Sequence, residues 1–302
     1  MYDRVRCSVM TTALVSGCSS GFGELTARTL AAAGHHVFAT MRGIQDRNTA
    51  AAQRLSEWAS ATAVELEVVE MDVTDDASVQ SAIAHALSQG PLDVVVNNAG
   101  ASAAGPLEAF SIGQMAGLLD LNVLGPMRVN KAVLPSMRAR RSGLIIWITS
   151  TLGRVLAGRG GLYPATKWAA EGFAESLHYQ VAPFGVDVVI VEPGAFPTPS
   201  VHHSMQPDDQ AIAAVYSALP RRPLNTHADA AYKLPDPQDV ADAVLQLMQL
   251  PAGRRPLRYV VGPIFTEGVP EYNRAYEALR AHMEEVLKRP DQAITWTPSA
   301  RR

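Results

Sequence analysis

Tyr163 and Lys167 stand four residues apart in a stretch whose apolar residues recur with helical spacing. Residues at i and i+4 share one face of a helix, so both side chains can point into one pocket. A free tyrosine has a pKa of about 10, too high for a base at neutral pH. A neighbouring ammonium favours the phenolate, and lowering the pKa by ~3 units corresponds to about 4 kcal/mol. The pair predicts acid/base chemistry in a desolvated cleft, although this spacing also occurs by chance on ordinary helix surfaces.

Ser150 follows a short apolar run, Leu144–Ile148, and precedes Tyr163 by thirteen residues. The end of a strand and the start of the next helix can bring these two side chains together. A hydroxyl in that place can donate to the carbonyl oxygen of a substrate. The alternative is an ordinary turn serine that bonds its own backbone.

Asn122 lies within a long segment with helical spacing, 113–141. Pro126, four residues later, has no N–H with which to bond the Asn122 carbonyl, and Gly125 loosens the same turn. The freed carbonyl needs another partner, and an ordered water is the natural one. If Lys167 also reaches that water, a proton path runs from solvent to Tyr163.

A glycine-rich loop joins the first apolar run to the first amphipathic segment. Glycines allow a tight turn and let backbone N–H groups approach a pyrophosphate, and the following helix adds its positive N-terminus. A plain strand-to-helix turn is the alternative, but the position between the first strand and the first helix favours dinucleotide binding. The loop residues assigned to this role are Gly17, Ser19, Ser20, Gly21, Phe22 and Gly23.

The end of the second strand indicates which dinucleotide is bound. An acid there would bind the 2′-hydroxyl of NAD, but the first acid is Asp46. Arg42 instead offers a guanidinium suited to a 2′-phosphate, so NADP(H) is favoured over NAD(H). The alternative is that Arg42 is a solvated loop charge.

Two later strand ends complete the predicted cofactor site. Asp72 follows the third strand and can accept a hydrogen bond from the adenine amino group, with Val73 beside it. Small residues at the end of the fourth strand let a cofactor pass close by. These residues are Asn98, Ala99 and Gly100.

The elements that must position these residues alternate between short β-branched runs and helical patterns. Strands buried on both faces and separated by helices imply a parallel sheet with helices on each side, an α/β doubly wound (Rossmann) fold. No composition break divides the chain, so we expect one domain, 1–302. The expected strands are 13–16, 37–41, 66–71, 94–97, 144–148, 186–191 and 258–261. The expected helices are 23–33, 50–59, 79–88, 113–141, 163–182, 211–219, 237–250 and 271–287.

The segment 195–235 departs from this rhythm and is rich in prolines and polar residues. It follows a strand, so it reaches the edge of the sheet where ligands bind, and we expect a substrate lid. Residues 289–302 form an expected tail. His202 and His203 lie in the lid segment without further ligands nearby, and we expect no metal site.

Composition narrows the function classes. The 302 residues carry 26 basic and 29 acidic side chains, a net charge of −3, so no global field favours nucleic acid or an anionic membrane. No apolar run reaches the ~18 residues of a membrane helix. Only Cys7 and Cys18 are present, which favours a reducing compartment, and we expect a cytoplasmic protein. The weak alternative is a lipoprotein signal ending at Cys18, which would destroy the glycine loop.

These residues together resemble the short-chain dehydrogenase/reductase family over Thr12–Val261. The resemblance implies hydride transfer between a nicotinamide and a carbonyl or alcohol carbon. It implies that Tyr163 is the acid/base, that Lys167 binds ribose and tunes Tyr163, that Ser150 polarises the oxygen and that Asn122 holds the relay water. It also implies a homodimer or homotetramer and no metal. The stretch that would contact the nicotinamide carboxamide contains Pro193, Gly194 and Thr198.

The substrate is expected to be a small, mostly hydrophobic molecule, because apolar candidates stand in the lid and near Ser150. The alternative function is a non-catalytic NADP(H)-binding redox sensor on the same fold. A sugar-nucleotide epimerase is disfavoured because only about 40 residues follow Val261. The apolar candidates are Phe196, Met205, Tyr216, Leu152, Leu156 and Leu162.

Overall fold

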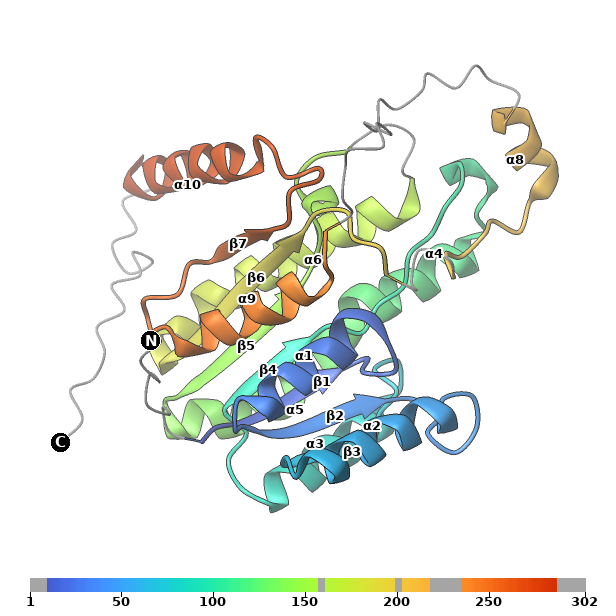
Figure 1. Ribbon diagram of the computed structural model, residues 1–302. Coiled ribbons are helices and arrows are strands. Elements are labelled where there is room, and N and C mark those ends of the chain that lie inside the picture. Colours follow the sequence, from blue (N-terminus) through green and yellow to red (C-terminus); the bar gives the residue numbers. More distant parts are fainter. Residues whose placement is uncertain (1–9, 157–160, 199–202, 218–234, 287–302) are drawn as a thin grey trace.

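A single parallel sheet organises the computed structural model, which describes residues 10–156, 161–198, 203–217 and 235–286. Its seven strands have the order β3-β2-β1-β4-β5-β6-β7 (Figure 1). The doubly wound sheet expected from the sequence is confirmed. The strands are β1 Thr12–Ser16, β2 His36–Met41, β3 Leu66–Glu70, β4 Val94–Asn97, β5 Gly143–Ile148, β6 Val186–Pro193 and β7 Arg258–Val261.

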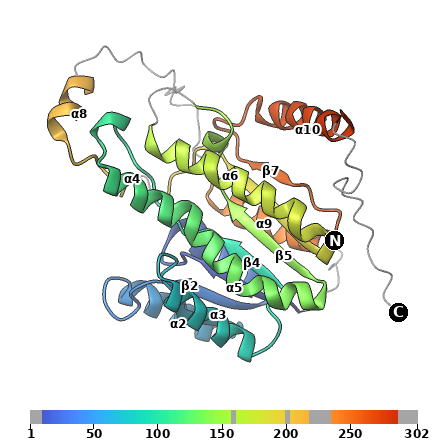
Figure 2. The same cartoon turned by 180° about the vertical axis from the view of Figure 1, so that it is seen from behind.

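Helices cover both faces of the sheet. Apolar residues of α1, α2 and α9 form one core layer with the sheet, and those of α3, α5 and α6 form the other (Figures 1 and 2). The α-helices are α1 Gly21–Ala32, α2 Thr49–Thr62, α3 Asp76–Ser88, α4 Ile112–Leu119, α5 Gly125–Arg140, α6 Leu162–Val181, α8 Gln210–Ser217, α9 Gln238–Gln249 and α10 Val269–Val286. Short 3₁₀ turns are η1 Leu107–Ala109, η3 Thr151–Gly153 and η4 Ala182–Phe184.

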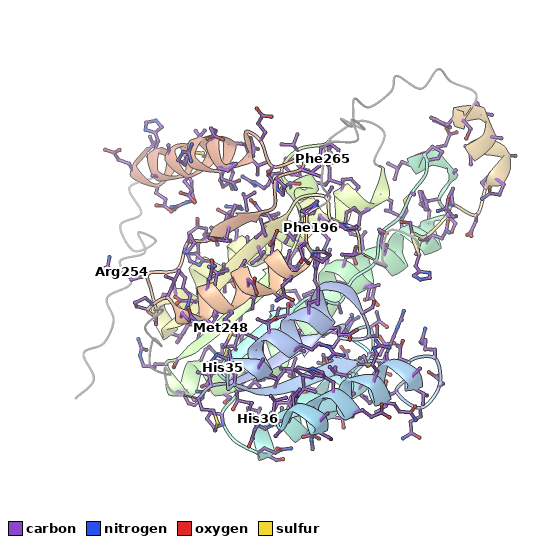
Figure 3. All side chains as sticks on the ribbon, viewed as in Figure 1. His35, His36, Phe196, Met248, Arg254 and Phe265 are labelled. Atoms are coloured by element: carbon purple, nitrogen blue, oxygen red, sulfur yellow. The ribbon has the colours of Figure 1, made fainter. Side chains whose placement is uncertain are left out.

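The strand order reverses between β1 and β4, which are neighbours in the sheet. The loops leaving these two strands diverge, and ligands of doubly wound sheets bind in the resulting crevice at the carboxyl ends of the strands. Figure 3 shows Phe196, just after β6, on this side of the molecule, whereas His35 and His36 lie at the opposite edge, where β2 begins. The sequence-predicted site residues therefore share one edge of the sheet.

The long helix expected over 113–141 is interrupted. Its middle, η2 Asp120–Leu124, is a π-helical turn in which the N–H of Gly125 donates to the carbonyl of Asp120, five residues back. Pro126 follows directly and cannot supply the ordinary i→i−4 bond, which is the local cause expected from the sequence. A Cβ on Gly125 would also lie 2.8 Å from Val73 Cγ2, so a side chain there would clash with Val73.

The described part of the expected lid, 195–198 and 203–217, packs against η1 and α4. Met205 pairs with Ala103, and the Ser111 hydroxyl donates to Asp208. The remaining lid residues, His202 and the tail 289–302 lie outside the described residues. Among the helices that the structure describes, none combines the length and apolar composition needed to cross a bilayer.

Candidate active site

A cavity of about 700 Å³ opens at the carboxyl edge of the sheet, between the glycine loop and the start of α6. The structure brings most of the sequence-predicted site residues to its wall. Those residues are Gly17, Ser19, Ser20, Gly21, Phe22, Arg42, Asp72, Val73, Asn98, Ala99, Gly100, Tyr163, Lys167 and Thr198.

The other predicted residues do not line the cavity: Gly23, Asn122, Ser150, Pro193 and Gly194. Two of them are glycines for packing reasons. A Cβ on Gly23 would lie 2.3 Å from the Gly17 carbonyl oxygen, and one on Gly194 would lie 2.0 Å from the Ile264 carbonyl oxygen. They therefore shape the backbone beside the cavity. Pro193 is the last residue of β6 and ends the strand just before Gly194.

The glycine loop is held open as a backbone cradle. Gly17 has φ +75°, and a Cβ there would lie 2.8 Å from Ala99 Cα, so both its conformation and its surroundings require glycine. The Asn98 side chain donates to the carbonyls of Ser16 and Gly17 at 2.8 and 3.2 Å, which ties the loop to the end of β4. The first turn of α1 begins at Gly21 on the cavity wall. This cradle and the helix N-terminus fit a pyrophosphate.

A polar turn after β2 forms the far end of the cavity. Arg42 Nη1 lies 3.6 Å from Asp72 Oδ2. Burial pushes the pKa of Asp72 up, but hydrogen bonds from Thr74 and the charge of Arg42 leave it below its usual value. Arg47 and Asn48 also line the cavity, and the Asn48 side chain donates to the Arg42 carbonyl. A second guanidinium therefore stands beside Arg42.

The α6 helix presents Tyr163 and Lys167 to the cavity from its first two turns. Lys167 Nζ donates to the Ile148 carbonyl at 3.0 Å and lies 5.6 Å from the centroid of the Tyr163 ring. Burial lowers the pKa of Lys167 to about 8, and the charge of Glu171 opposes that fall. Burial raises the pKa of Tyr163 to about 12, and a hydrogen bond with Ser150 opposes that rise. Burial thus favours the protonated phenol of Tyr163.

Ser150 makes the backbone bond of a turn serine and also a hydrogen bond with Tyr163. Its hydroxyl accepts from the Leu152 N–H at 3.1 Å, as a turn serine does, and it bonds to Tyr163. It belongs to the residues just after β5, immediately behind the cavity wall formed by Ile148 and Thr149.

The buried side chain of Asn122 is fully engaged with the backbone nearby. Its oxygen accepts from the Ala101 N–H at 2.9 Å, and its amide donates to the Ala101 carbonyl and to Thr166 Oγ1. The Thr166 hydroxyl in turn donates to the Tyr163 carbonyl at 2.8 Å. The Asn122 side chain therefore links the π-helical turn both to α6 and to the residues that follow β4. Only the main-chain carbonyl of Asn122 is then left for the relay role expected from the sequence.

Sequence reasoning did not assign several other residues of the wall. Thr149 and Ile148 had a signal, since they lie at the end of a predicted strand, and Arg47 is a second arginine in the turn after Arg42. Leu121, in the π-helical turn, had no such signal, whereas His203 lies in the segment that was expected to form the lid. The unassigned residues are Met41, Arg47, Asn48, Met71, Ala101, Ser102, Leu121, Ile148, Thr149 and His203. Within the described residues, no three His, Cys, Asp or Glu side chains are grouped to hold a metal ion.

The profile of the short chain dehydrogenase family matches residues 11–209, about two thirds of the chain. The chain belongs to this family.

Among its relatives, retinol dehydrogenase 8 of Bos taurus is 40% identical over 189 residues, which cover 61% of this short-chain dehydrogenase and 58% of that protein. Estradiol 17-beta-dehydrogenase 1 of Rattus norvegicus is 34% identical over 252 residues, 80% of this chain and 71% of that one. The match to retinol dehydrogenase 8 thus spans less than two thirds of that relative.

A solved structure is similar over almost its whole length. An alcohol dehydrogenase from Thermococcus sibiricus in complex with 5-hydroxy-NADP is 28% identical, with a TM-score of 0.67 over 83% of this chain and 96% of that chain. Solved relatives thus include a member that binds a nicotinamide dinucleotide, and the cradle and cavity of this chain fit such a group.

Replacing the buried Lys167 by methionine is expected to stabilise the protein. Folding lowers the pKa of this lysine from 10.5 to about 8, so below pH ~8 the charged lysine lowers the free energy of unfolding by its full amount. This loss of stability disappears as the pH rises towards 10.5, the pKa of the unfolded state. Allowing for the lost bond to Ile148, the variant gains about 2 kcal/mol at neutral pH. Urea unfolding at neutral and alkaline pH measures the difference, which should shrink as the pH rises.

The matched control is Lys131→Met, at an exposed position on α5. It should leave the free energy of unfolding nearly unchanged. A Lys167→Met variant less stable than the wild type at neutral pH would contradict this reading of the site.

Proposed function

We propose that this chain transfers a hydride between NADP(H) and a carbonyl or secondary alcohol of a mostly hydrophobic small molecule. The observation that carries the proposal is the meeting of two sets of residues in one cavity. The glycine loop and Arg42 line one part of it, and Tyr163 and Lys167 line another. A dinucleotide cradle and an acid/base pair are thus placed side by side.

The dinucleotide supplies or accepts the hydride at its nicotinamide ring. Tyr163 gives a proton to the substrate oxygen, or takes one from it, at its phenol oxygen. Ser150, already bonded to Tyr163, donates to the same oxygen and holds it in place. Lys167 binds the ribose hydroxyls, and its ammonium favours the phenolate form of Tyr163. The main-chain carbonyl of Asn122 holds the relay water that links Lys167 to solvent.

The turn after β2 supports a preference for NADP(H). Arg42 and Arg47 both line this end of the cavity, and guanidinium groups bind phosphate with paired hydrogen bonds. Asp72, the acid nearest to Arg42, is tied to Thr74, and Glu70 is bonded to the N–H groups of Gly43 and Ile44. Both carboxylates are therefore engaged elsewhere and do not take the role of the acid that binds the ribose 2′-hydroxyl in NAD sites.

Apolar side chains in the segments around Tyr163 support an apolar substrate, although none of the six apolar residues expected from the sequence lines this cavity. Phe196 packs edge-on against Phe22 in the core, and the Tyr216 hydroxyl donates to Glu108. Met205 packs in an apolar cluster with Leu162, next to Tyr163. Val155 and Leu156, which follow η3, are exposed by 47% and 63%. The related proteins named above, by their names, act on retinol and estradiol, which are apolar alcohols.

We also propose a homodimer or homotetramer in the cytoplasm. Apolar side chains remain exposed along α4 and α6, and they suit helix packing between copies. These are Leu119, Trp168 and Phe173.

The function is tested by NADPH oxidation with a panel of apolar ketones and small ionic keto acids. We expect saturable turnover of apolar ketones, and a loss of about a hundredfold or more in kcat for Tyr163→Phe with NADPH binding retained. Near-normal turnover by Tyr163→Phe would reject its role. Binding of NADPH without turnover of any compound would favour the sensor, and turnover confined to keto acids would refute the apolar substrate.

The cofactor preference is tested by Arg42→Ala. Since a guanidinium binds the 2′-phosphate and nothing equivalent in NADH, kcat/KM with NADPH should fall at least about tenfold relative to NADH. Arg138→Ala on the far side of α5 is the control and should leave the ratio unchanged. A wild-type preference for NADH, or an unchanged ratio in Arg42→Ala, would overturn this assignment.

A further inference from the structure

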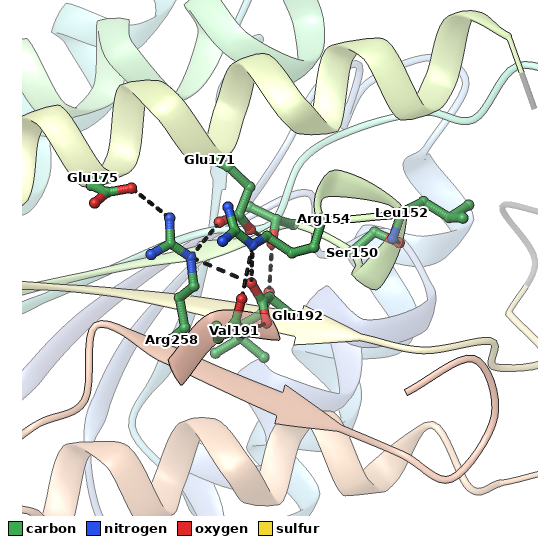
Figure 4. A network of polar contacts seen from close by, with 10 residues as sticks. Ser150, Leu152, Arg154, Glu171, Glu175, Val191, Glu192 and Arg258 are labelled. Carbon is green, nitrogen blue, oxygen red and sulfur yellow. Dashed lines mark hydrogen bonds and ion pairs between the residues drawn. The ribbon is translucent and has the colours of Figure 1, made fainter. Parts of the chain in front are cut away.

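Behind the cavity lies a buried cluster of charged side chains. Its two arginines and three glutamates are each no more than 8% exposed. They come from α6, β6, β7 and the residues that follow Ser150, as Figure 4 shows. The charged members are Arg154, Glu171, Glu175, Glu192 and Arg258.

Arg258, on β7, binds two carboxylates of α6 at once. Its Nε lies 2.9 Å from Glu171 Oε2, and its Nη2 lies 2.7 Å from Glu175 Oε2. Glu171 and Glu175 stand one and two helical turns beyond Lys167. Through these two ion pairs, Arg258 holds the helix that carries Tyr163 and Lys167 against the last strand of the sheet.

Arg154 links the turn that follows Ser150 to the same cluster. It follows the short turn η3 that begins just after Ser150, and its Nε donates to Asn273 Oδ1 on α10 at 2.8 Å. The Asn273 amide donates to Glu192 Oε2 at 2.6 Å. The Arg154 guanidinium also lies over the ring of Tyr276, at 4.8 Å from its centroid. Helix α10 thus closes the cluster from outside.

Glu171 contacts the segment around Ser150 and belongs to the helix that carries Tyr163 and Lys167. Its Oε1 accepts from the Thr149 hydroxyl at 2.7 Å, and Thr149 lines the cavity directly before Ser150. A Cβ on Gly153 would lie 3.0 Å from Glu171 Cγ, so the turn after Ser150 rests against this side chain. Glu171 also lies one helical turn from Lys167, whose pKa its charge raises.

The contacts of Glu171 favour its ionised form. The two arginines and the Lys167 ammonium balance the charge of the three glutamates. Glu192 Oε1 accepts no hydrogen bond but lies 3.5 Å from Arg258 Nε and 3.7 Å from Arg154 Nε, whereas both oxygens of Glu171 accept a hydrogen bond. Burial and the charge of Glu171 together raise the pKa of Glu192 to about 8. Burial leaves the pKa of Glu171 above its usual value as well, and the charge of Arg258 and the hydrogen bond from the Thr149 hydroxyl limit that rise.

We propose that Glu171 is a positioning residue for the proposed reaction: it holds the Ser150 turn through Thr149 and Gly153, and it keeps the Lys167 ammonium charged. The inference rests on the proposed hydride transfer, since it assigns Lys167 to the dinucleotide. The charged and titratable groups that face this pair are Tyr163 and Glu175 on α6, Arg154 after β5, Glu192 on β6, Arg258 on β7, Tyr276 on α10 and His203 across the cavity.

The test compares Glu171→Gln with Glu175→Gln. Each change removes one carboxylate bonded to Arg258 and keeps the length of the side chain, but only Glu171 lies next to Lys167. NADPH affinity is measured by fluorescence titration on the alkaline side of neutrality, where imidazoles are neutral. In the wild type the affinity should fall around the Lys167 pKa of about 8. Removing the nearby negative charge lowers that pKa, so the midpoint of Glu171→Gln should move to lower pH by about one unit.

Glu175→Gln should keep the wild-type midpoint. An unchanged midpoint in Glu171→Gln, or an equal shift in both variants, would overturn the inference and leave the function standing. Absence of NADPH binding to the wild type would instead overturn the proposed function.

A second variant covers the case in which Glu171→Gln does not fold. Thr149→Val keeps the shape of the side chain and removes the hydroxyl, which bonds Glu171 at 2.7 Å and lies 3.0 Å from the Val191 carbonyl oxygen. Since small misplacements of a reacting group are costly, kcat should fall about tenfold while the Kd for NADPH stays the same. Normal kcat in Thr149→Val would contradict positioning of Ser150 through Glu171.

Discussion

Burial of the Lys167 ammonium is the constraint on which the rest of the site depends. A primary ammonium in a desolvated wall is costly, and here it is held by the Ile148 carbonyl and by the charge of Glu171 one turn away. Burial also keeps Tyr163 protonated. The two groups therefore need another positive charge before a phenolate forms, which suits a reaction that waits for its cofactor. In the proposed reaction, this loss of stability serves the acid/base role of the pair.

The fold brings these groups together because parallel strands end at one edge. β1 and β4 supply the cradle, β2 and β3 supply the turn with Arg42 and Asp72, and the residues after β5 supply Ser150. The π-helical turn around Asn122 ties the residues after β4 to α6 through Ala101 and Thr166. Positioning thus comes from short polar links between elements that are already fixed by core packing.

The sheet and the Tyr163–Lys167 pair could be predicted from the sequence because they depend on local signals. Short, continuous β-branched runs indicate strands buried on both faces, and the i, i+4 spacing indicates a shared helix face. Pro126 likewise predicted a disturbed helix, although the sequence did not predict its π-helical form. The expected apolar wall was less accurate, since Phe196 is used in the core beside Phe22. The buried cluster could not be predicted, because its glutamates and arginines are distant in sequence and look like surface charges until the strands assemble.

The most direct measurement of the central claim is the ultraviolet difference spectrum of the Tyr163 phenolate, taken as wild type minus Tyr163→Phe at mildly alkaline pH. Without dinucleotide, Tyr163 should stay protonated, because burial holds its pKa at about 12. Saturating NADP⁺ should produce a phenolate signal that disappears in Lys167→Met. A spectrum that NADP⁺ leaves unchanged, or a signal equally strong without Lys167, would contradict the account.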